Sequence, residues 1–380
     1  MDHPGNPLSR RSTLFAGAGL AAAAAGLCFA APTAAEAGPA SDLASRLTPE
    51  QLAGQRVVFS YPGTTVPQAL LDRIAGGVVG GVILFGENVS SLAQVTAAVQ
   101  QLHEAAQGSP VRAPLLVMTD QEGGRVRRLP GGPVLSQKQI GASPDPARAA
   151  AEAGREAGQL LRGAGLNVNL APVLDVFRAP GDFIDQFGRS YSSNPEVVSV
   201  CGRAFIEAQQ AAGVAATAKH FPGLGPAATG QNTDLGPVTL TTPLAELRGV
   251  DERPYGPAIA AGVDLAMVSW AVHTALDPHR PAGLSARVVE EELRRRHGFR
   301  GVTVTDAIDA GALKPFGTAP QNAVAAATAG MDLILEASRD VANGQAVVDG
   351  LAQALADGRL GFPGFTAALD RIIRLRQRLA

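Results

Sequence analysis

The sequence is poor in the residues that stabilise or mark several classes of protein. Only two of its 380 residues are cysteine, and 4% are aromatic. Cys28 lies in a segment that we expect to be removed on export, which leaves Cys201 alone. A single cysteine cannot form an internal disulfide, so the hydrophobic core must stabilise the fold. Cys201 itself lies in a helical pattern, where a buried and inert thiol is expected.

An excess of charge of one sign is also lacking. The 32 Lys and Arg residues nearly balance the 34 Asp and Glu residues, which gives a net charge of −2. No long-range field would attract nucleic acid or acidic lipid, so neither partner is expected. The six histidines show no His-x-His or His-x-x-x-His spacing, so no metal site is expected, and no other cofactor is implied. A Gly-x-Ser-x-Gly motif is absent, which argues against a serine hydrolase.

An apolar, alanine-rich run from Ala16 to Ala31 follows the pair Arg10-Arg11. It ends near Ala35-Glu36-Ala37, which fits a signal-peptidase site. Paired arginines before such a run are typical of the twin-arginine export route. The alternative is a membrane anchor, but a short run of Ala and Gly would hold a bilayer weakly. We therefore predict an export signal at residues 1–37 and one mature domain at 38–380, secreted or associated with the cell envelope, without a stable membrane span.

Eight short runs, mostly apolar or β-branched throughout, are typical of parallel strands that are covered on both faces. They are Val57–Ser60, Gly81–Phe85, Leu115–Thr119, Val168–Leu170, Ala215–Ala218, Leu265–Ser269, Gly301–Thr305 and Asp332–Leu335. Segments with helical periodicity lie between and after them, for example Leu92–Ala106, Ala149–Leu161, Pro195–Ala211, Leu244–Ala261, Ala286–Arg296 and Phe365–Leu379. This alternation predicts a single (β/α)8 barrel. An open doubly wound sheet is the alternative, but no Gly-x-Gly-x-x-Gly loop follows the early strands.

Polar residues follow the C-terminal ends of several predicted strands. Asp120 follows the third, Lys219-His220 the fifth, Asp306 the seventh and Glu336 the eighth. Active sites of barrel enzymes lie at this end of the strands, where the loops converge. Charged donors and acceptors with few aromatic residues suit a hydroxyl-rich ligand.

Five ordered segments resemble one enzyme family. They are Asp120–Val126, Ala171–Val176, Phe187–Ser192, Lys219–Gly223 and Gly301–Asp306. On these motifs the chain resembles family 3 glycoside hydrolases, and in particular the branch of single-barrel β-N-acetylglucosaminidases. The resemblance implies a retaining hydrolase that removes terminal β-linked N-acetylhexosamine, most often N-acetylglucosamine, from chitin- or peptidoglycan-derived saccharides. A β-glucosidase or xylosidase of the same family, or a catalytically weakened carbohydrate-binding protein of the cell wall, is the alternative. A monomer is the working expectation.

The same resemblance implies residue roles. Asp306 matches the nucleophile that forms the glycosyl-enzyme. Asp120, Arg189, Lys219 and His220 match residues that bind the hydroxyls of the terminal sugar. For Arg189 a structural ion pair with a barrel acid is the alternative, because a buried cation needs a partner. The nearby carboxylate in Ala171–Val176, Asp175, has two open interpretations, a structural ion pair or support of the site.

The chain departs from the family in the loop after Lys219–Gly223. The family places Asp-Ser-His there, and the histidine is its general acid/base. Here the loop contains no histidine, and Asn232-Thr233-Asp234 takes its place if a short insertion is allowed. Asp234 would then be the acid/base, with its ordinary pKa of ~3.9 raised by burial or by Asp306. The alternatives are another donor, such as Glu122 or a residue on a mobile loop, and a protein that hydrolyses sugars poorly.

Overall fold

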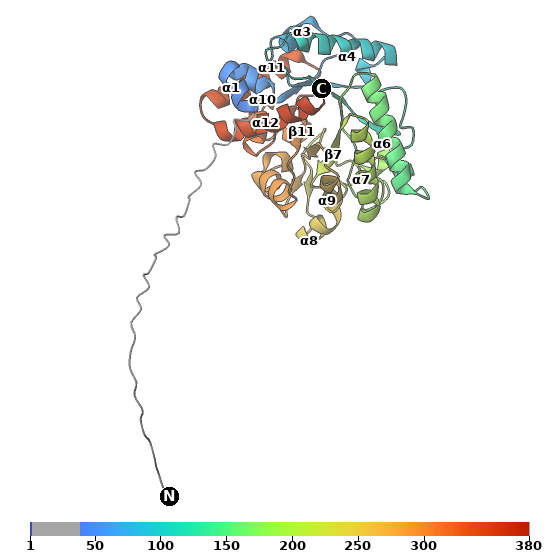
Figure 1. The fold of residues 1–380 in the computed structure, drawn as a ribbon. Coiled ribbons are helices and arrows are strands. Elements are labelled where there is room, and N and C mark those ends of the chain that lie inside the picture. Colours follow the sequence, from blue (N-terminus) through green and yellow to red (C-terminus); the bar gives the residue numbers. More distant parts are fainter. Residues whose placement is uncertain (2–38, 380) are drawn as a thin grey trace, which may run out of the picture. The chain divides into compact units, whose positions relative to one another are not determined.

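The computed structural model describes Met1 and residues 39–379, and the rest of the predicted export signal lies outside this part of the chain. Eight parallel strands form a closed barrel with the neighbours in the order β1-β12-β11-β9-β7-β6-β3-β2. Their bounds are β1 Val57–Phe59, β2 Gly81–Leu84, β3 Leu116–Thr119, β6 Val168–Asn169, β7 Ala215–Phe221, β9 Leu265–Val268, β11 Val302–Ala307 and β12 Leu333–Leu335. Every predicted run overlaps one of these strands, although β7 and β11 extend past the predicted ends. The (β/α)8 barrel is therefore confirmed and the open sheet is excluded (Figure 1).

Alternate residues of each strand face opposite sides of the barrel wall, as the period of two requires. Leu116 and Met118 of β3 belong to a cluster inside the barrel, to which every strand contributes. Val117, between them, belongs instead to the larger core between the strands and the helices. Both faces of the wall are therefore apolar, which explains why the strands read as continuous hydrophobic runs.

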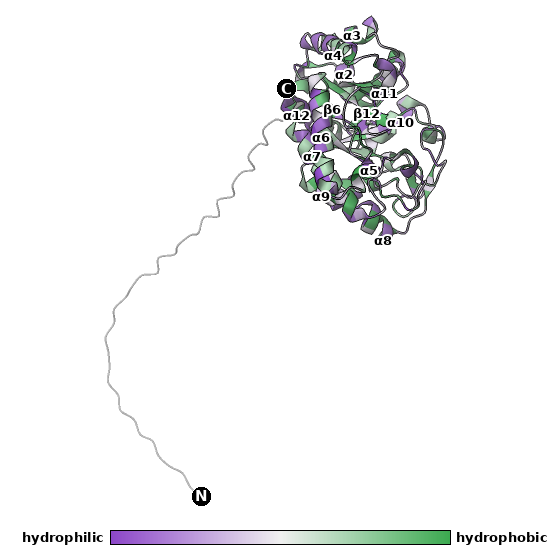
Figure 2. Ribbon diagram, turned by 90° about the vertical axis from the view of Figure 1, so that its right-hand side faces the viewer, coloured by the Kyte–Doolittle hydropathy of each residue, from purple (hydrophilic) through white to green (hydrophobic). Residues whose placement is uncertain are grey.

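Helices surround the barrel (Figure 1). The longer ones are α1 Pro39–Arg46, α3 Gln68–Ala75, α4 Leu92–Gln107, α6 Pro146–Gly163, α7 Pro195–Ala211, α10 Ala319–Thr328, α11 Val341–Ala356 and α12 Phe362–Arg378. Figure 2 shows hydrophilic and hydrophobic residues mixed along these helices, as expected where one face packs on the barrel. No helix in the described part of the chain is both long and apolar enough to cross a membrane.

The helices begin at recognisable caps. Asp145 accepts a hydrogen bond from the backbone of Arg148, and Pro146 occupies the first turn of α6, where its missing N–H costs nothing. Helices α6 and α7 pack closely because Gly154 has no side chain. A Cβ at that position would lie 2.3 Å from the carbonyl oxygen of Phe205 in α7.

The predicted helix over Leu244–Ala261 is wrong as a single element. The structure has a short turn α8 at Leu244–Glu246, a wider π-helical turn at Leu247–Asp251 and a separate α9 at Tyr255–Ala260. Pro254 and Pro257 supply the physical reason, because neither has an N–H with which to continue a helical hydrogen-bond ladder.

Two small sheets cover the carboxyl-terminal end of the barrel. An antiparallel pair, β4 Gln121–Gly123 and β5 Val126–Arg127, follows β3 directly. A parallel pair, β8 Thr239–Leu240 and β10 Val272–His273, joins the loops after β7 and β9. Val126 of β5 lines the cavity at the end of the barrel where the polar residues were predicted to converge.

Candidate active site

A cavity of about 450 Å³ opens at the carboxyl-terminal end of the barrel. All six residues that the sequence singles out for catalysis or binding line it: Asp120, Arg189, Lys219, His220, Asp234 and Asp306. They come from the ends of β3, β7 and β11 and from the loops that follow β6 and β7. The structure therefore brings together residues that lie up to 186 positions apart, from Asp120 to Asp306.

One side of the cavity is a buried network of charges around Lys219. The Lys219 Nζ lies 2.7 Å from Asp120 Oδ1 and 2.8 Å from Glu122 Oε1. Burial alone would favour the neutral amine, but the charges of Asp120 and Glu122 raise the pKa of Lys219. The ammonium group is thus a fixed cation, with Asp120 held beside it at the cavity wall.

Arg189 completes this network by binding both oxygens of Glu122. Its Nε and Nη2 donate to Glu122 Oε2 and Oε1 at 2.9 and 2.8 Å. Arg189 also lines the cavity, so it both forms an ion pair and faces the ligand space. Burial would raise the pKa of Glu122, but the cations of Arg189 and Lys219 lower it to about 2. Glu122 is therefore ionised at any working pH and is a poor proton donor.

His220 is oriented by Asp175, which is completely buried behind it. The His220 Nδ1 lies 2.7 Å from Asp175 Oδ2, and Asp175 Oδ1 accepts from the backbone N–H of Leu224 at 2.6 Å. A carboxylate at Nδ1 fixes the plane of the imidazole ring and leaves Nε2 as the nitrogen available to a ligand. Asp175 does not line the cavity, so it supports His220 from behind.

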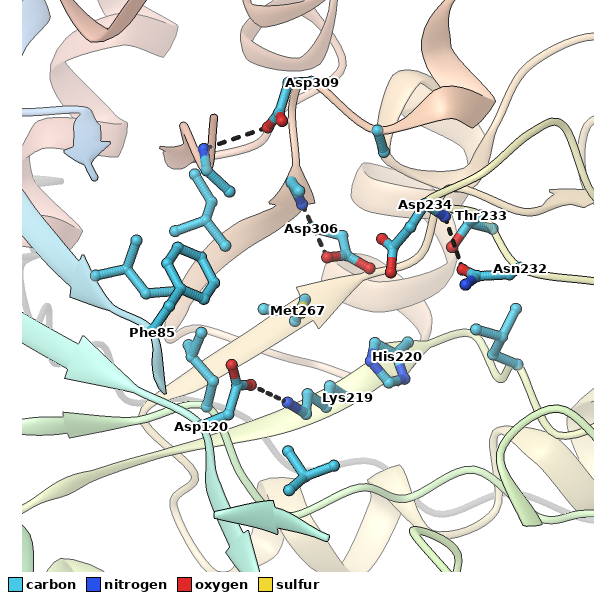
Figure 3. Close-up of a pocket in the computed structure, with 18 of the residues that line it drawn as sticks. Phe85, Asp120, Lys219, His220, Asn232, Thr233, Asp234, Met267, Asp306 and Asp309 are labelled. Carbon is cyan, nitrogen blue, oxygen red and sulfur yellow. Dashed lines mark hydrogen bonds and ion pairs between the residues drawn. The ribbon is translucent and has the colours of Figure 1, made fainter. Parts of the chain in front are cut away.

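Two carboxylates, those of Asp234 and Asp306, face one another on the side of the cavity away from Lys219. Asp306 lies at the end of β11, where its Oδ1 accepts from the backbone N–H of Ala307 at 2.8 Å. Asp234 lies in the loop after β7, and Figure 3 shows its carboxylate directed towards Asp306. Although Asp234 as a residue is exposed, it lines the cavity, and its carboxylate faces Asp306 there. Desolvation and the charge of Asp306 raise the pKa of Asp234 to about 6.

Sequence patterns missed several residues of the cavity wall, including Phe85, Arg128, Asp309 and Arg339. Arg339 lies over the ring of Phe85, with its guanidinium carbon 4.0 Å from the ring centroid. Asp309 lies three positions after Asp306, and this proximity could have indicated that it lines the cavity. Arg128 and Arg339 lie in loops, where no strand-end argument could place them.

The predicted strand-end acid Glu336 does not line the cavity. It is completely buried and accepts hydrogen bonds from the Ser60 hydroxyl and the Ser338 backbone at 3.3 and 3.0 Å. Burial raises the pKa of Glu336 to about 7. Its contacts fix the loop after β12, so it supports the wall from behind.

One group among the described residues offers three possible metal ligands within 4.8 Å of one another: Glu252, Glu292 and His297. Two arginines already neutralise it, with Arg248 2.7 Å from Glu292 and Arg296 3.1 Å from the same carboxylate. The group also lies outside the cavity lining. The cavity itself offers aspartates, cations and one histidine, an arrangement suited to hydroxyl groups rather than to a metal ion.

The family is decided by comparison with known proteins. Residues 51–375 match the model of the glycosyl hydrolase family 3 N-terminal domain. The chain belongs to this family. It is 48% identical over 331 residues to an "uncharacterized secreted glycosyl hydrolase" of Arthroderma benhamiae, which covers 86% of this chain and 93% of the relative. It is 34% identical to a "beta-hexosaminidase" of Xylella fastidiosa, over 82% of this chain and 94% of that protein.

Solved family 3 structures have the same fold. A β-N-acetylglucosaminidase from a Paenibacillus strain superposes with a TM-score of 0.82 at 36% identity, covering 88% of this chain and 63% of that longer chain. A β-N-acetylhexosaminidase from Beutenbergia cavernae gives 0.78 at 32% identity, covering 87% of this chain and 98% of its own. As a member of family 3, the chain is a glycoside hydrolase.

Proposed function

We propose that this family 3 protein is an exported, retaining β-N-acetylhexosaminidase in which Asp306 is the nucleophile and Asp234 the general acid/base. The observation that carries the proposal is the pair of facing carboxylates, one of which has a pKa raised to about 6. Retaining glycosidases need one ionised carboxylate and one that holds a proton. Asp234 and Asp306 supply this asymmetry, since Asp306 favours the protonated form of its neighbour.

The first chemical step forms the glycosyl-enzyme. A carboxylate oxygen of Asp306 attacks the anomeric carbon, and the bond from that carbon to the glycosidic oxygen breaks. Asp234 donates its proton to the departing oxygen, so the aglycone leaves as an alcohol. In the second step Asp234, now ionised, takes a proton from water while the water oxygen attacks the same carbon. Asp306 leaves as a carboxylate, and the sugar is released with its β configuration retained.

The buried charges on the opposite side of the cavity would hold the terminal sugar. Asp120 accepts hydrogen bonds from sugar hydroxyls, whereas Lys219, Arg189 and His220 donate to hydroxyl oxygens or, in the case of His220, exchange a hydrogen bond through Nε2. Charged partners form stronger hydrogen bonds than neutral ones. Because the network is already paired and buried, it needs little rearrangement when the sugar binds.

The choice of N-acetylhexosamine rests on the relatives. Several are named beta-hexosaminidases at 31 to 35% identity, and two of the similar solved structures are β-N-acetylglucosaminidase and β-N-acetylhexosaminidase. The name of the Arthroderma relative, a secreted glycosyl hydrolase, supports export. Substrates outside the cytoplasm would be chitin- or peptidoglycan-derived saccharides.

A hydrolysis screen tests the proposal. We expect the purified protein to cleave aryl β-N-acetylglucosaminide faster than the matching β-glucoside, β-galactoside and β-xyloside. Asp306→Ala should lower kcat/KM on the preferred substrate by at least ~10⁴-fold, because removing a nucleophile abolishes the covalent pathway. Activity that survives in Asp306→Ala would contradict the assigned nucleophile. Preference for a glucoside or xyloside would contradict the assigned sugar.

A further inference from the structure

The loop that carries Asp234 is fastened to the segment that follows Asp306. The backbone N–H of Gly311 donates to the carbonyl oxygen of Asp234 at 2.8 Å. The next N–H, of Ala312, donates to the carbonyl oxygen of Thr233 at 2.9 Å. Both donors lie in the chain segment that follows β11, the strand that carries Asp306. One stretch of chain therefore carries one member of the carboxylate pair and binds the backbone of the other.

This contact requires glycine at position 311 for reasons of space. A Cβ there would lie 2.3 Å from the carbonyl oxygen of Leu235 and 2.8 Å from that of Asp234. Both distances are shorter than a carbon atom tolerates next to backbone oxygen. Since the atoms met are backbone atoms, a rotamer change cannot relieve the clash, and the Asp234 loop would have to move outwards.

The segment on which the loop rests is itself fixed. Gly311 to Leu313 form a buried 3₁₀ turn, η6. Asn322 of α10, which is 2% exposed, donates to the carbonyl oxygens of Leu313 and Gly317 at 3.3 and 3.0 Å. A side chain added at Gly311 would consequently displace the loop more readily than the turn.

The beginning of the same loop is held separately. The Leu224 N–H donates to Asp175, and the Phe183 N–H donates to the carbonyl oxygen of Ala227 at 2.9 Å. Leu224 and Ala227 also belong to a small buried apolar cluster. Displacement at Gly311 would therefore affect the end of the loop that carries Asp234, while the Lys219 side of the cavity remains in place.

We propose that Gly311 is a positioning residue, which sets the place of the Asp234 carboxylate relative to Asp306 through two backbone hydrogen bonds. This inference rests on the acid/base role proposed for Asp234. A misplacement of ~1 Å can lower a rate by ~10²-fold, because proton transfer depends steeply on geometry. Gly311 does not line the cavity, so its effect should appear only where proton donation limits the reaction.

The test compares Gly311→Ala with Gly236→Ala on two substrates. Gly236 lies in the same loop, does not adopt a left-handed backbone angle, and would place a Cβ more than 4 Å from every residue other than its chain neighbours. For an N-acetylglucosaminide with a poor alkyl leaving group, Gly311→Ala should lower kcat/KM by ~10- to 100-fold. For a dinitrophenyl glycoside, which needs no proton, the change should stay within about threefold. Gly236→Ala should leave both values unchanged within about twofold.

A double-mutant cycle separates positioning from general damage. In an Asp234→Ala background, adding Gly311→Ala should change kcat/KM by less than about threefold, because the group it positions is gone. The alkaline limb of the pH profile should also move to lower pH in Gly311→Ala, since Asp234 would lie farther from Asp306 and closer to water. A fold defect would instead lower activity on both substrates and persist in the double variant, and that result would overturn the inference.

Two further outcomes keep the inference and its premise apart. If Asp234→Ala lowers kcat/KM equally for both substrates, the acid role itself fails. If Asp234→Ala shows leaving-group dependence and Gly311→Ala does not, only the positioning role fails. Hydrogen exchange of the wild-type protein gives a check without any variant. The amides of Gly311 and Ala312 should exchange slowly, and rapid exchange at both would contradict the hydrogen bonds on which the inference depends.

Discussion

The two sides of the cavity are built in different ways. Lys219, Asp120 and Glu122 come from or directly after strands, and side-chain ion pairs of 2.7 and 2.8 Å hold them. Asp234 lies in a loop, and backbone hydrogen bonds to Gly311 and Ala312 hold that loop. The first side gains its geometry from charges that must be buried together. The second side gains its geometry from the path of the backbone, so the Asp234 side chain makes few of the contacts that fix its own position.

In the proposed mechanism, this difference separates sugar binding from proton transfer. A group that binds hydroxyls works best when its charge is constant, and the pKa of about 2 for Glu122 keeps the network charged. A group that donates and accepts protons must be able to change its charge. Asp234 has a pKa of about 6, which lies within the range where both forms are accessible.

The largest effect is expected from breaking the charged side. Lys219→Met leaves Glu122 and Asp120 without their shared cation, and Glu122 is 1% exposed. Removing one partner of a buried ion pair costs ~3–5 kcal/mol, so the midpoint of thermal unfolding should fall clearly. The kcat/KM should fall by ~10³-fold for good and poor leaving groups alike, because binding of the sugar is common to both.

Lys138→Met is a control that removes a lysine–aspartate ion pair outside the cavity. Lys138 also pairs with a buried aspartate, Asp185, at 2.6 Å, but it does not line the cavity. It should affect thermal unfolding but leave kcat/KM nearly unchanged. A loss in Lys219→Met that depended on the leaving group, or one matched by Lys138→Met, would remove the distinction between the two sides.

A smaller and more selective effect is expected from Asp234→Ala. Poor leaving groups need a proton, so their kcat/KM should fall by ~10²–10³-fold. Activated aryl glycosides should lose less than about tenfold in the same parameter. The midpoint of thermal unfolding should change by only a few degrees, because Asp234 is exposed and its side chain forms none of the loop's anchoring bonds. Initial rates across a series of aryl and alkyl N-acetylglucosaminides measure this, and equal losses throughout would count against the acid role.

The smallest effect is a pH dependence that belongs to one side alone. In the proposed mechanism Asp234 must be protonated in the first step, and desolvation and Asp306 raise its pKa to about 6. We therefore expect kcat/KM for poor leaving groups to fall about tenfold for each pH unit above ~6. Glu122, with a pKa of about 2, stays ionised throughout this range and contributes no change. Profiles from pH 4 to 8 should lose this alkaline limb in Asp234→Ala, and a limb that persists there would assign it to another group.

Much of the barrel could be predicted because its strands are buried on both faces. Runs such as Leu115–Thr119 and Leu265–Ser269 are apolar throughout and stand out in the sequence. The positions of Lys219 and Asp306 near the carboxyl-terminal ends of strands could be predicted from these runs alone. The segment Leu244–Ala261 misled for the opposite reason. Its apolar residues have helical spacing, but Pro254 and Pro257 have no N–H to donate, and the spacing of apolar residues does not show that loss.

Residues in loops could be predicted less well, since no period fixes their position. Arg339 lines the cavity after a turn in which its backbone adopts a left-handed angle, φ 61°. Few residues other than glycine take that conformation, and nothing in the sequence marks it. An ion pair of Arg189 with a barrel acid was foreseen as an alternative, but Glu122 could not be identified as that acid, because side chains alone join positions separated by 67 residues.

The fastening of the Asp234 loop has a consequence for how such enzymes can diverge. The hydrogen bonds from Gly311 and Ala312 join backbone groups only, so they do not depend on which side chain occupies position 234. A lineage could exchange imidazole for carboxylate there, or the reverse, and keep the surrounding architecture unaltered. The identity of the proposed proton donor can thereby vary in evolution, whereas the buried charges around Lys219 depend on one another and can change only together.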